Sequence, residues 1–273
     1  MHPWLWQGDG WAVPTYISAI TFGFIVATLA LHREIQASRI EPRQIYDIAV
    51  LILPSAWIGA RLFMVFEEPE RFLAAPWLLL LPGAGWVFYG GFVLAAVMVL
   101  LQARRRGLDP WAVGDVFSPV FPLGIVFGRL GCLGGGCCHG RPADWPFGVE
   151  VPWSVRYYVR GRIPEVLRGV SLHPAPLYES ALGLVLFAVL TQVHRRQRFS
   201  GQTGALLLMG YGGGRFVVEL FRGDLERGFH LGGLLSTSQV VGVAGIAAGA
   251  ALYAWRARVG VHGASRAGGG GLE

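Results

Sequence analysis

One segment of the chain, residues 128–141, concentrates glycine, arginine and cysteine and has the sequence GRLGCLGGGCCHGR. Each glycine in a helix interior costs about 1 kcal/mol relative to alanine, so we expect the backbone to depart from a helix here. Glycine also lets a ligand approach backbone N–H groups closely, and clustered N–H groups bind phosphate. The segment therefore predicts either an anion-binding loop or a re-entrant turn that serves only packing.

Four charged side chains lie inside or at the edge of long apolar runs, namely Arg61, Arg129, Arg215 and Glu219. An ionised side chain in hydrocarbon costs at least about 2.5 kcal/mol on insertion scales, so such groups usually face a protein interior and serve function. Arg215 and Glu219 are four residues apart and would pair on one helix face, which Arg222 continues. Converging arginines would bind phosphate bidentately, whereas the alternative is an ion pair that only fixes helix packing.

The three cysteines of the chain, Cys132, Cys137 and Cys138, all lie in the same segment and are followed by His139. Such a set has the ligand number of a zinc site, but adjacent cysteines lack the usual spacer of two to four residues, and we predict no metal. A disulfide between Cys132 and either neighbour is expected in an oxidising compartment, and it would leave one free thiol. A covalent role for that thiol is a further alternative, and the sequence does not choose among these.

The composition indicates the solvent in which these groups must be positioned. Of 273 residues, 53% are hydrophobic and only 15% are charged. A soluble domain carries about 25% charged residues, because charge covers its water-facing surface. The composition therefore excludes a soluble globular domain and predicts an all-α integral membrane protein. The net charge of +6 agrees with basic loops beside membrane spans and does not indicate nucleic-acid binding.

Apolar runs of about 18 residues or more cross a hydrocarbon layer of about 30 Å as helices. We predict about seven such spans, near Tyr16 to Leu31, Asp47 to Phe66, Trp77 to Leu101, Trp111 to Gly131, Pro176 to Val193, Thr203 to Phe221 and Leu235 to Trp255. Arginines follow the first, third, fifth and seventh spans, so these connections are expected to be cytoplasmic. The N-terminus is then outside and the C-terminus inside.

This arrangement predicts one polytopic membrane domain over residues 1–259, with a small extracytoplasmic insertion at about residues 132–175. The tail, residues 260–273, is expected to be disordered because it is rich in glycine. A transporter would usually show repeated halves with broken helices in corresponding positions. The chain has one evident break, which argues against transport.

Five blocks of the chain, in order, resemble the motifs of the prolipoprotein diacylglyceryl transferase family. GAR at 59–61 resembles the family's GAR motif, and FYGG at 88–91 resembles its FHGG motif. The segment 128–141 resembles the signature GRxGNFxNGExxG. HPAPLYE at 173–179 resembles HPSQLYE, and RFVVELFR at 215–222 resembles FRxxVExFR. The resemblance implies a bacterial inner-membrane enzyme that moves diacylglyceryl from phosphatidylglycerol to the lipobox cysteine of a prolipoprotein signal peptide. It implies no cofactor.

The chain departs from these motifs at several positions. Tyr89 stands where the family's FHGG motif has histidine, and Cys132, Gly135 and Cys137 stand where the signature has two asparagines and a glutamate. An unperturbed tyrosine has a pKa near 10 and is a poor base at neutral pH, although it donates hydrogen bonds. The alternatives are a divergent member that binds or transfers another phospholipid group, and a non-catalytic lipid-binding membrane protein.

If the family's chemistry holds, Arg129 and Arg215 would hold the lipid phosphate and Glu219 would orient Arg215. Tyr89 or His173 would accept the proton of the acceptor thiol, with His173 having the more suitable pKa, although His173 could equally pin the fifth span. We expect the substrate contacts to come from a wider set, namely Arg61, Gly131, Cys132, Gly136, Gly140, Arg141, Tyr178 and Arg222. Glu179 suits a helix N-terminus without any catalytic role.

Overall fold

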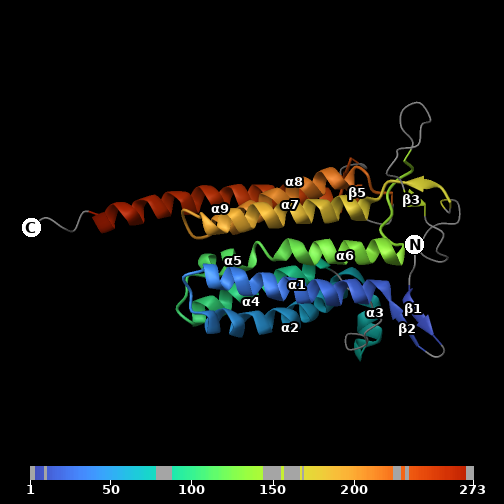
Figure 1. Ribbon diagram of the computed structural model, residues 1–273, viewed down its shortest axis with the longest axis horizontal. Helices are drawn as coiled ribbons and strands as arrows, with labels where there is room; N and C mark the ends of the chain where they lie inside the picture. Colours follow the sequence, from blue (N-terminus) through green and yellow to red (C-terminus); the bar gives the residue numbers. More distant parts are fainter. Residues whose placement is uncertain are drawn as a thin grey trace, which may run out of the picture. The chain divides into compact units, whose positions relative to one another are not determined.

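The computed structural model describes residues 4–8, 11–77, 88–143, 155–156, 167, 169–223, 229–230 and 234–268. Its helices are α1 (Thr15–Ala37), α2 (Pro42–Glu67), α3 (Pro69–Ala74), α4 (Phe88–Arg105), α5 (Pro110–Phe117), α6 (Phe121–Gly135), α7 (Ala175–Arg195), α8 (Gln202–Glu219) and α9 (Thr237–Gly268) (Figure 1). The strands are β1 (Trp4–Gly8), β2 (Trp11–Pro14), β3 (Val155–Arg156), β4 (Ser171–Leu172), β5 (Phe229–His230) and β6 (Leu235–Ser236). They pair as the antiparallel hairpins β1–β2, β3–β4 and β5–β6.

The chain divides into two compact units, one formed by residues 1–34 with 117–273 and the other by residues 35–116. The prediction of one membrane domain over residues 1–259 stays a prediction, because compact units of this kind can belong to one domain. In the second unit, α2 packs on α4 through glycines: a Cβ on Gly91 would lie 2.8 Å from the backbone oxygen of Ala56, and Gly59 and Gly90 also face each other's backbone. Small residues at such positions let two helices approach closely, so this pair forms a compact unit of its own.

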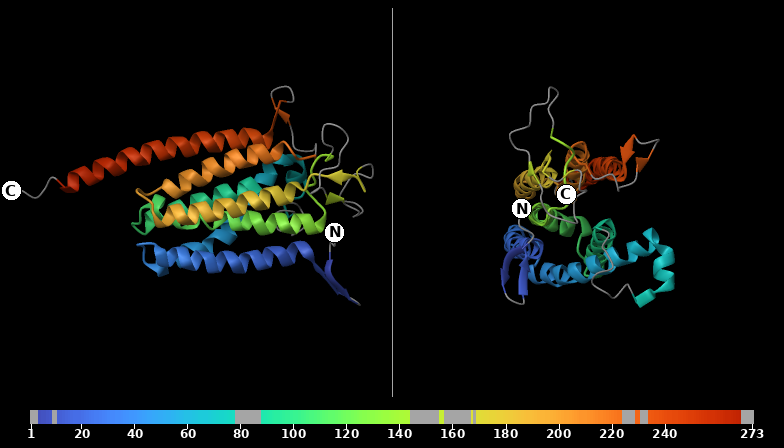
Figure 2. Two further views of the ribbon diagram at one scale, coloured as in Figure 1. Left: turned by 45° about the horizontal axis from the view of Figure 1, so that its top comes forward. Right: turned by 90° about the vertical axis from the view of Figure 1, so that its right-hand side faces the viewer.

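In the first unit, helices α6, α7, α8 and α9 run side by side, and α1 lies along α6 (Figures 1 and 2). Glycines again set the spacing. A Cβ on Gly183 of α7 would lie 2.9 Å from the backbone oxygen of Pro122 in α6, and one on Gly212 of α8 would lie 2.6 Å from that of Gly242 in α9. The helices of this unit are therefore held at backbone-contact distance.

Apolar side chains cover the outer faces of the helices. On α1, Phe22, Ile25 and Leu29 are 59%, 52% and 62% exposed. Within the described ranges, five segments are long and apolar enough to cross a membrane: Thr15–Ala37, Pro42–Phe66, Pro110–Gly135 (α5 with α6), Ala175–Arg195 and Thr237–Val259. Exposed apolar faces on such helices agree with an integral membrane protein of all-α type.

The predicted count of about seven spans is met only in part. The other two expected spans overlap α4 and α8, which have 18 residues each. Neither helix is among the five segments that are long and apolar enough to cross a membrane. The third expected span began at Trp77, whereas α4 begins at Phe88, and residues 78–87 lie outside the described residues.

The helix was expected to reach about Gly131 and the backbone to break within residues 128–141. The break lies inside this segment but later than expected, because α6 continues through Gly131 and Gly134 and ends at Gly135. Packing of Gly131 and Gly134 against the start of α1 offsets their low helix propensity, since a Cβ on Gly131 would lie 3.0 Å from the Tyr16 ring and one on Gly134 would lie 2.5 Å from Thr15, whereas Gly128 has open space. The tail was expected to be disordered from residue 260; α9 is assigned to Gly268 and residues 269–273 lie outside the described residues, so the disorder of the tail stays a prediction.

Candidate functional site

Several charged residues of the first unit lie at one end of its helices. Figure 1 shows the C-terminal ends of α6 and α8 and the N-terminal ends of α7 and α9 at the same end of this unit, beside strands β3 and β5. A helix carries partial positive charge at its N-terminus and exposes backbone donors there. Polar groups on these four ends can therefore meet although the helices themselves are apolar.

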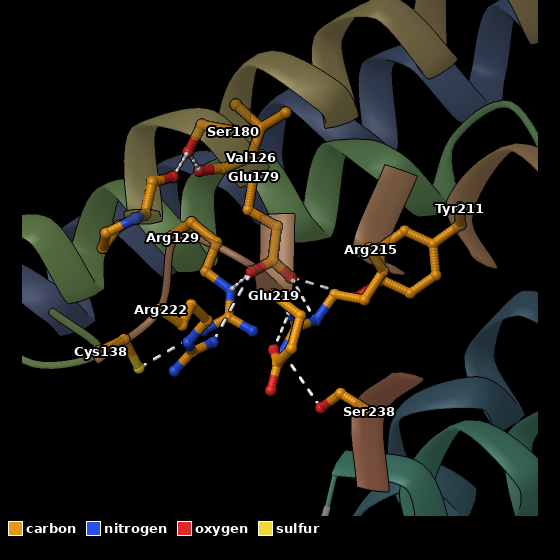
Figure 3. Close-up of polar contacts among 11 residues, drawn as sticks. Val126, Arg129, Cys138, Glu179, Ser180, Tyr211, Arg215, Glu219, Arg222 and Ser238 are labelled. Carbon is orange, nitrogen blue, oxygen red and sulfur yellow. Dashed lines mark hydrogen bonds and ion pairs between the residues drawn. The ribbon is translucent and has the colours of Figure 1, made fainter. Parts of the chain in front are cut away.

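A buried carboxylate, that of Glu179 on α7, is the centre of this cluster (Figure 3). Its Oε2 lies 3.0 Å from Arg129 Nε of α6 and 3.8 Å from Arg222 Nη1. Its Oε1 lies 3.7 Å from Arg215 Nε of α8 and accepts a hydrogen bond of 3.2 Å from the Tyr211 hydroxyl. The Glu179 side chain is only 1% exposed, so three guanidinium groups surround a carboxylate shielded from solvent.

Arg215 extends the cluster along α8 and to helix α9. Its Nη1 lies 2.6 Å from Glu219 Oε2, one turn further along α8, which confirms the predicted i, i+4 pair. Its Nη2 donates a hydrogen bond of 3.1 Å to Ser238 Oγ of α9. Arg215 is 6% exposed and is therefore fixed from three sides. We call these five residues the ion cluster: Arg129, Glu179, Arg215, Glu219 and Arg222.

The packing of α6 on α7 places the first pair of this ion cluster. Ser180, next to Glu179, donates hydrogen bonds of 2.8 Å to the backbone oxygen of Pro176 and 3.2 Å to that of Val126. Val126 precedes Arg129 by three residues and so lies on the same side of α6. The hydroxyl therefore joins the two helices one turn from the point where the guanidinium meets the carboxylate (Figure 3).

The ion cluster has an excess of positive charge. Three guanidinium groups and two carboxylates carry a net charge of +1. The side chain of Arg129 is 24% exposed, whereas those of the other four members are at most 8% exposed. An anion would therefore reach Arg129 first, and the buried members would hold that guanidinium in a fixed orientation. Guanidinium groups bind phosphate oxygens through paired hydrogen bonds.

The glycine-rich segment lies beside Arg129. Helix α6 ends at Gly135 and is capped by Gly136, whose left-handed conformation (φ 71°, ψ 31°) turns the chain and lets the Cys137 N–H bond the Cys132 carbonyl at 3.0 Å. The next thiol, that of Cys138, lies 3.4 Å from Arg129 Nη1. Hydrogen bonds from the neighbouring thiols and the charges of nearby arginines lower the pKa of the Cys138 thiol below its usual range. All three cysteines are free thiols, so the expected disulfide is not formed.

Backbone pairing holds the end of this segment. Gly140 forms an antiparallel bridge with Arg222, and its N–H bonds the His173 carbonyl at 3.1 Å. A Cβ on Gly140 would lie 2.8 Å from the Phe221 backbone oxygen. The close approach of Gly140 and of Gly131 to neighbouring protein atoms explains both glycines by packing. Their predicted contacts with a ligand, like those of Gly136 and Cys132, remain predictions.

His173 packs with two aromatic residues, Tyr178 and Phe221, which directly precede Glu179 and Arg222 of the ion cluster in the sequence. Its Nδ1 is 3.0 Å from the Tyr178 hydroxyl, and its ring packs on Phe221 with centroids 5.2 Å apart. Arg141 lies over the same Phe221 ring at 5.8 Å. Burial, and then the charge of Arg141, lower the pKa of His173 below 6.5. The imidazole is therefore neutral at neutral pH and able to accept a proton.

The structure does not test the remaining two predicted site residues in relation to this cluster, because both belong to the second unit. Arg61 of α2 is buried, with 2% exposure, and its guanidinium lies 5.9 Å from the centroid of the Trp57 ring. Tyr89 lies in the first turn of α4, and its side chain is outside the described residues. Their roles at the site remain predictions.

The sequence of the chain matches a known protein family. Residues 3–255 match the sequence profile described as "Prolipoprotein diacylglyceryl transferase". The chain belongs to this family. It is 34% identical over 259 residues to the phosphatidylglycerol–prolipoprotein diacylglyceryl transferase of Bordetella bronchiseptica, covering 90% of this chain and 92% of that protein. The enzymes of the same name from Clostridium tetani and Methylocella silvestris are 28% and 34% identical, over 88% and 91% of this chain and 92% and 89% of theirs.

Three of the five motifs that resemble the family's meet in the first unit, whereas those at 59–61 and 88–91 belong to the second. The signature forms the end of α6 and the turn after it, the HPAPLYE block begins α7, and the RFVVELFR block ends α8. Sequence reasoning found the arginines and Glu219 but assigned Glu179 only to helix capping, and it missed Tyr211 and Ser238. The available signals for Glu179 were its position at the edge of an apolar run and its place as the last residue of the HPAPLYE block. Its three arginine partners come from segments 36 to 50 residues away along the chain, which only the fold brings together.

Proposed function

We propose that this chain is a phosphatidylglycerol–prolipoprotein diacylglyceryl transferase, which moves the diacylglyceryl group of phosphatidylglycerol to the thiol of a prolipoprotein cysteine. Membership of the family and the names of its relatives support this activity. The single structural observation that carries it is the ion cluster. Its most exposed member, Arg129, is held at 3.0 Å by a buried carboxylate, and its side chain is 24% exposed, so a lipid phosphate could reach it.

The proposed reaction is a displacement at the glyceryl carbon bonded to the phosphate. The thiolate of the acceptor forms a C–S bond to that carbon as the C–O bond to phosphate breaks, and the phosphate leaves as glycerol phosphate. Before the step, the thiolate and the phosphodiester each carry one negative charge. Afterwards the thioether is neutral and the leaving phosphate carries both charges. Arg129, supported by Arg215 and Arg222, would stabilise the charge that grows on the leaving group.

The acceptor thiol must lose its proton before it attacks, because the thiolate is the nucleophile. His173 is our candidate acceptor for this proton, since its lowered pKa keeps the imidazole neutral and Tyr178 fixes the ring through Nδ1. A neutral imidazole near the operating pH suits general base catalysis. Tyr89 would donate a hydrogen bond to the substrate rather than act as the base.

The remaining predicted residues would complete the substrate contacts. Arg61 and Arg141 would add positive charge for the phosphate, and the backbone around Gly136 would approach the headgroup closely. The substrates imply a site at the outer face of the bacterial cytoplasmic membrane, because prolipoprotein signal peptides arrive there. We accordingly propose seven spans with the N-terminus outside, the C-terminus inside and the insertion at residues 132–175 on the outer side. The arginines after alternate spans support this orientation.

The test is a transfer assay with purified protein, phosphatidylglycerol labelled in its acyl chains, and a lipobox peptide. We expect label on the peptide thiol and release of glycerol phosphate in equal amounts. Arg129→Ala should lower the rate about 100- to 1000-fold, as does loss of other donors to a developing anion. Arg33→Ala, an exposed arginine of α1, is the matched control and should leave the rate unchanged.

Failure to label the peptide, while a relative from the same family labels it under the same conditions, would refute the named activity. In that case binding of the labelled lipid by the intact protein, lost in Arg129→Ala, would indicate the alternative function of a phospholipid-binding member of the family. Transfer at the normal rate by Arg129→Ala would refute the proposed site.

A further inference from the structure

The chain has three cysteines, and the fold brings all three together. The sulfur atoms of Cys132, Cys137 and Cys138 lie within 4.8 Å of one another. Cys132 is buried, and the other two are half-buried. The proposed transfer reaction uses none of these thiols as a reactant. Their convergence therefore needs an explanation of its own.

The helix end produces this convergence. The left-handed Gly136 turns the chain back over the last turn of α6, and the Cys137 N–H closes the turn on the Cys132 carbonyl at 3.0 Å. Cys138 then adopts a left-handed conformation as well, with φ 58°. Among the described residues it is the one non-glycine residue with positive φ. This conformation costs a residue with a Cβ of order 1 kcal/mol or more, and such strain is often found at functional sites.

The backbone on the far side of the thiols is fixed as well. Hydrogen bonds join the Gly223 N–H to the His139 carbonyl at 3.3 Å and the Arg141 N–H to the Phe221 carbonyl at 3.0 Å. One end of the thiol turn is thus anchored in α6 and the other in the chain that follows α8. A site held from both ends is organised before any ligand arrives, which lowers the entropic cost of binding.

We propose that Cys132, Cys137 and Cys138 form a binding site for a soft, thiophilic metal ion, and specifically for three-coordinate Cu(I). Thiolate ligands at about 2.3 Å around one trigonal ion would stand about 4 Å from one another. The observed limit of 4.8 Å requires each sulfur to move by less than about 1 Å. Soft thiolates favour Cu(I), whereas a structural zinc ion takes four ligands.

The surroundings suit this ion better than zinc. Within the described ranges, the group of potential ligands contains the three sulfurs and no fourth donor. The neighbouring His139 turns its Nδ1 toward the Gly140 carbonyl at 3.0 Å. Three thiolates with Cu(I) carry a charge of −2, and Arg129 Nη1, 3.4 Å from Cys138 Sγ, offsets part of it. The inference does not depend on the proposed transfer activity.

The three-way contact also argues against a disulfide as the main role of the cluster. An S–S bond needs sulfurs about 2.05 Å apart and would join only two of the thiols. Cys137 and Cys138 are adjacent, and adjacent cysteines are poorly placed for the usual disulfide geometry because their side chains diverge. A metal ion uses all three sulfurs and requires the smaller movement.

The test is a competition titration on the full-length protein in detergent, reduced and kept without oxygen. Cu(I), maintained by ascorbate, is added in the presence of bathocuproine disulfonate, whose Cu(I) complex is coloured. We expect the protein to withdraw one Cu(I) per chain and to lose its three reactive thiols as it does so. X-ray absorption should show three sulfurs around the ion. Each single Cys→Ser change should weaken binding at least about 100-fold, more than loss of a second-shell partner would.

His139→Gln is the matched control, and circular dichroism checks that every variant is folded. This change should leave Cu(I) affinity unchanged, because the proposed ligands are the three sulfurs alone. Equal loss of affinity in His139→Gln and in Cys138→Ser would overturn the three-coordinate site in favour of a four-ligand one. The proposal is also overturned if the reduced protein, with three titratable thiols, withdraws no Cu(I), or if the ion has two sulfur neighbours.

Discussion

Replacing Glu179 by glutamine tests whether the buried carboxylate orients the arginines. Glutamine has the same shape and keeps an oxygen that can accept the Tyr211 hydrogen bond, but it lacks the charge that holds Arg129 at 3.0 Å. Removing one partner of a buried ion pair typically costs about 3–5 kcal/mol, because the remaining charge is left uncompensated. We therefore expect Arg129 to move toward solvent and the protein to lose thermal stability.

Although Glu179→Gln destabilises the protein, it should strengthen the electrostatic attraction of the site for an anion. The net charge of the ion cluster rises from +1 to +2 when the carboxylate is removed. At an effective dielectric constant of about 20, a carboxylate about 7 Å from a bound phosphate repels it by about 2.4 kcal/mol, and Glu179→Gln abolishes this repulsion. Ground-state binding should therefore not weaken. Misplacement of a catalytic group by about 1 Å can cost 100-fold in rate, so we expect kcat to fall about 100-fold.

The assay is steady-state transfer over a range of phosphatidylglycerol concentrations. We expect Glu179→Gln to lower kcat about 100-fold while KM stays level or falls. Glu219→Gln is the matched control, because Glu219 contacts the more deeply buried Arg215 rather than Arg129, and its effect on kcat should be smaller. An increase in KM with kcat unchanged would show that Glu179 contributes to binding and not to orientation, and it would refute this reasoning.

Three further changes test neighbouring parts of the site. Tyr211→Phe removes the hydroxyl that bonds the buried carboxylate at 3.2 Å, and we expect kcat/KM to fall about 10-fold because a hydrogen bond to a charged group is worth about 1.5–3 kcal/mol. For His173, kcat/KM should fall only as the pH drops below 6.5, because the lowered pKa delays protonation. Arg141→Gln removes a positive charge that disfavours the imidazolium, so it should raise that pKa and move the acid limb to higher pH; an unmoved limb would exclude His173 as the titrating base. Gly140→Ala should lower the thermal midpoint and the activity, because its Cβ has no space and overpacking costs about 1–3 kcal/mol, whereas Gly124→Ala in α6 has open space and should lower neither.

Local sequence patterns predicted part of this site correctly. The pairing of Arg215 with Glu219 depends only on helical periodicity, and it is present at 2.6 Å. The helix positions depend on apolar runs and were also predictable, with errors at the ends. The end of α6 at Gly135 was not, because the apolar run alone placed the end of this span near Gly131. The close approach of Tyr16 to Gly131 supplies a tertiary contact that local propensity does not include.

The role of Glu179 was hidden for a different reason. Its partners, Arg129, Arg215 and Arg222, lie on other segments, and only the packing of α6, α7 and α8 brings them to one point. In sequence, a carboxylate near the start of α7 has a sufficient explanation in the helix dipole. A buried ion cluster is a property of several helices together, so a single-segment pattern cannot distinguish a capping carboxylate from a central one.

The net charge of the ion cluster also bears on how the proposed reaction ends. The net charge of +1 on the cluster balances the single negative charge of phosphatidylglycerol. The departing glycerol phosphate carries two negative charges, of which the cluster balances only one. The native site would therefore hold the product less completely than a site of charge +2 would. Glu179→Gln raises the charge of the site to +2, so we expect glycerol phosphate to inhibit the variant more strongly than the native protein. A burst of thioether product followed by slow turnover would show that release has become limiting, whereas a slow single turnover would assign the loss of kcat to the misplaced Arg129.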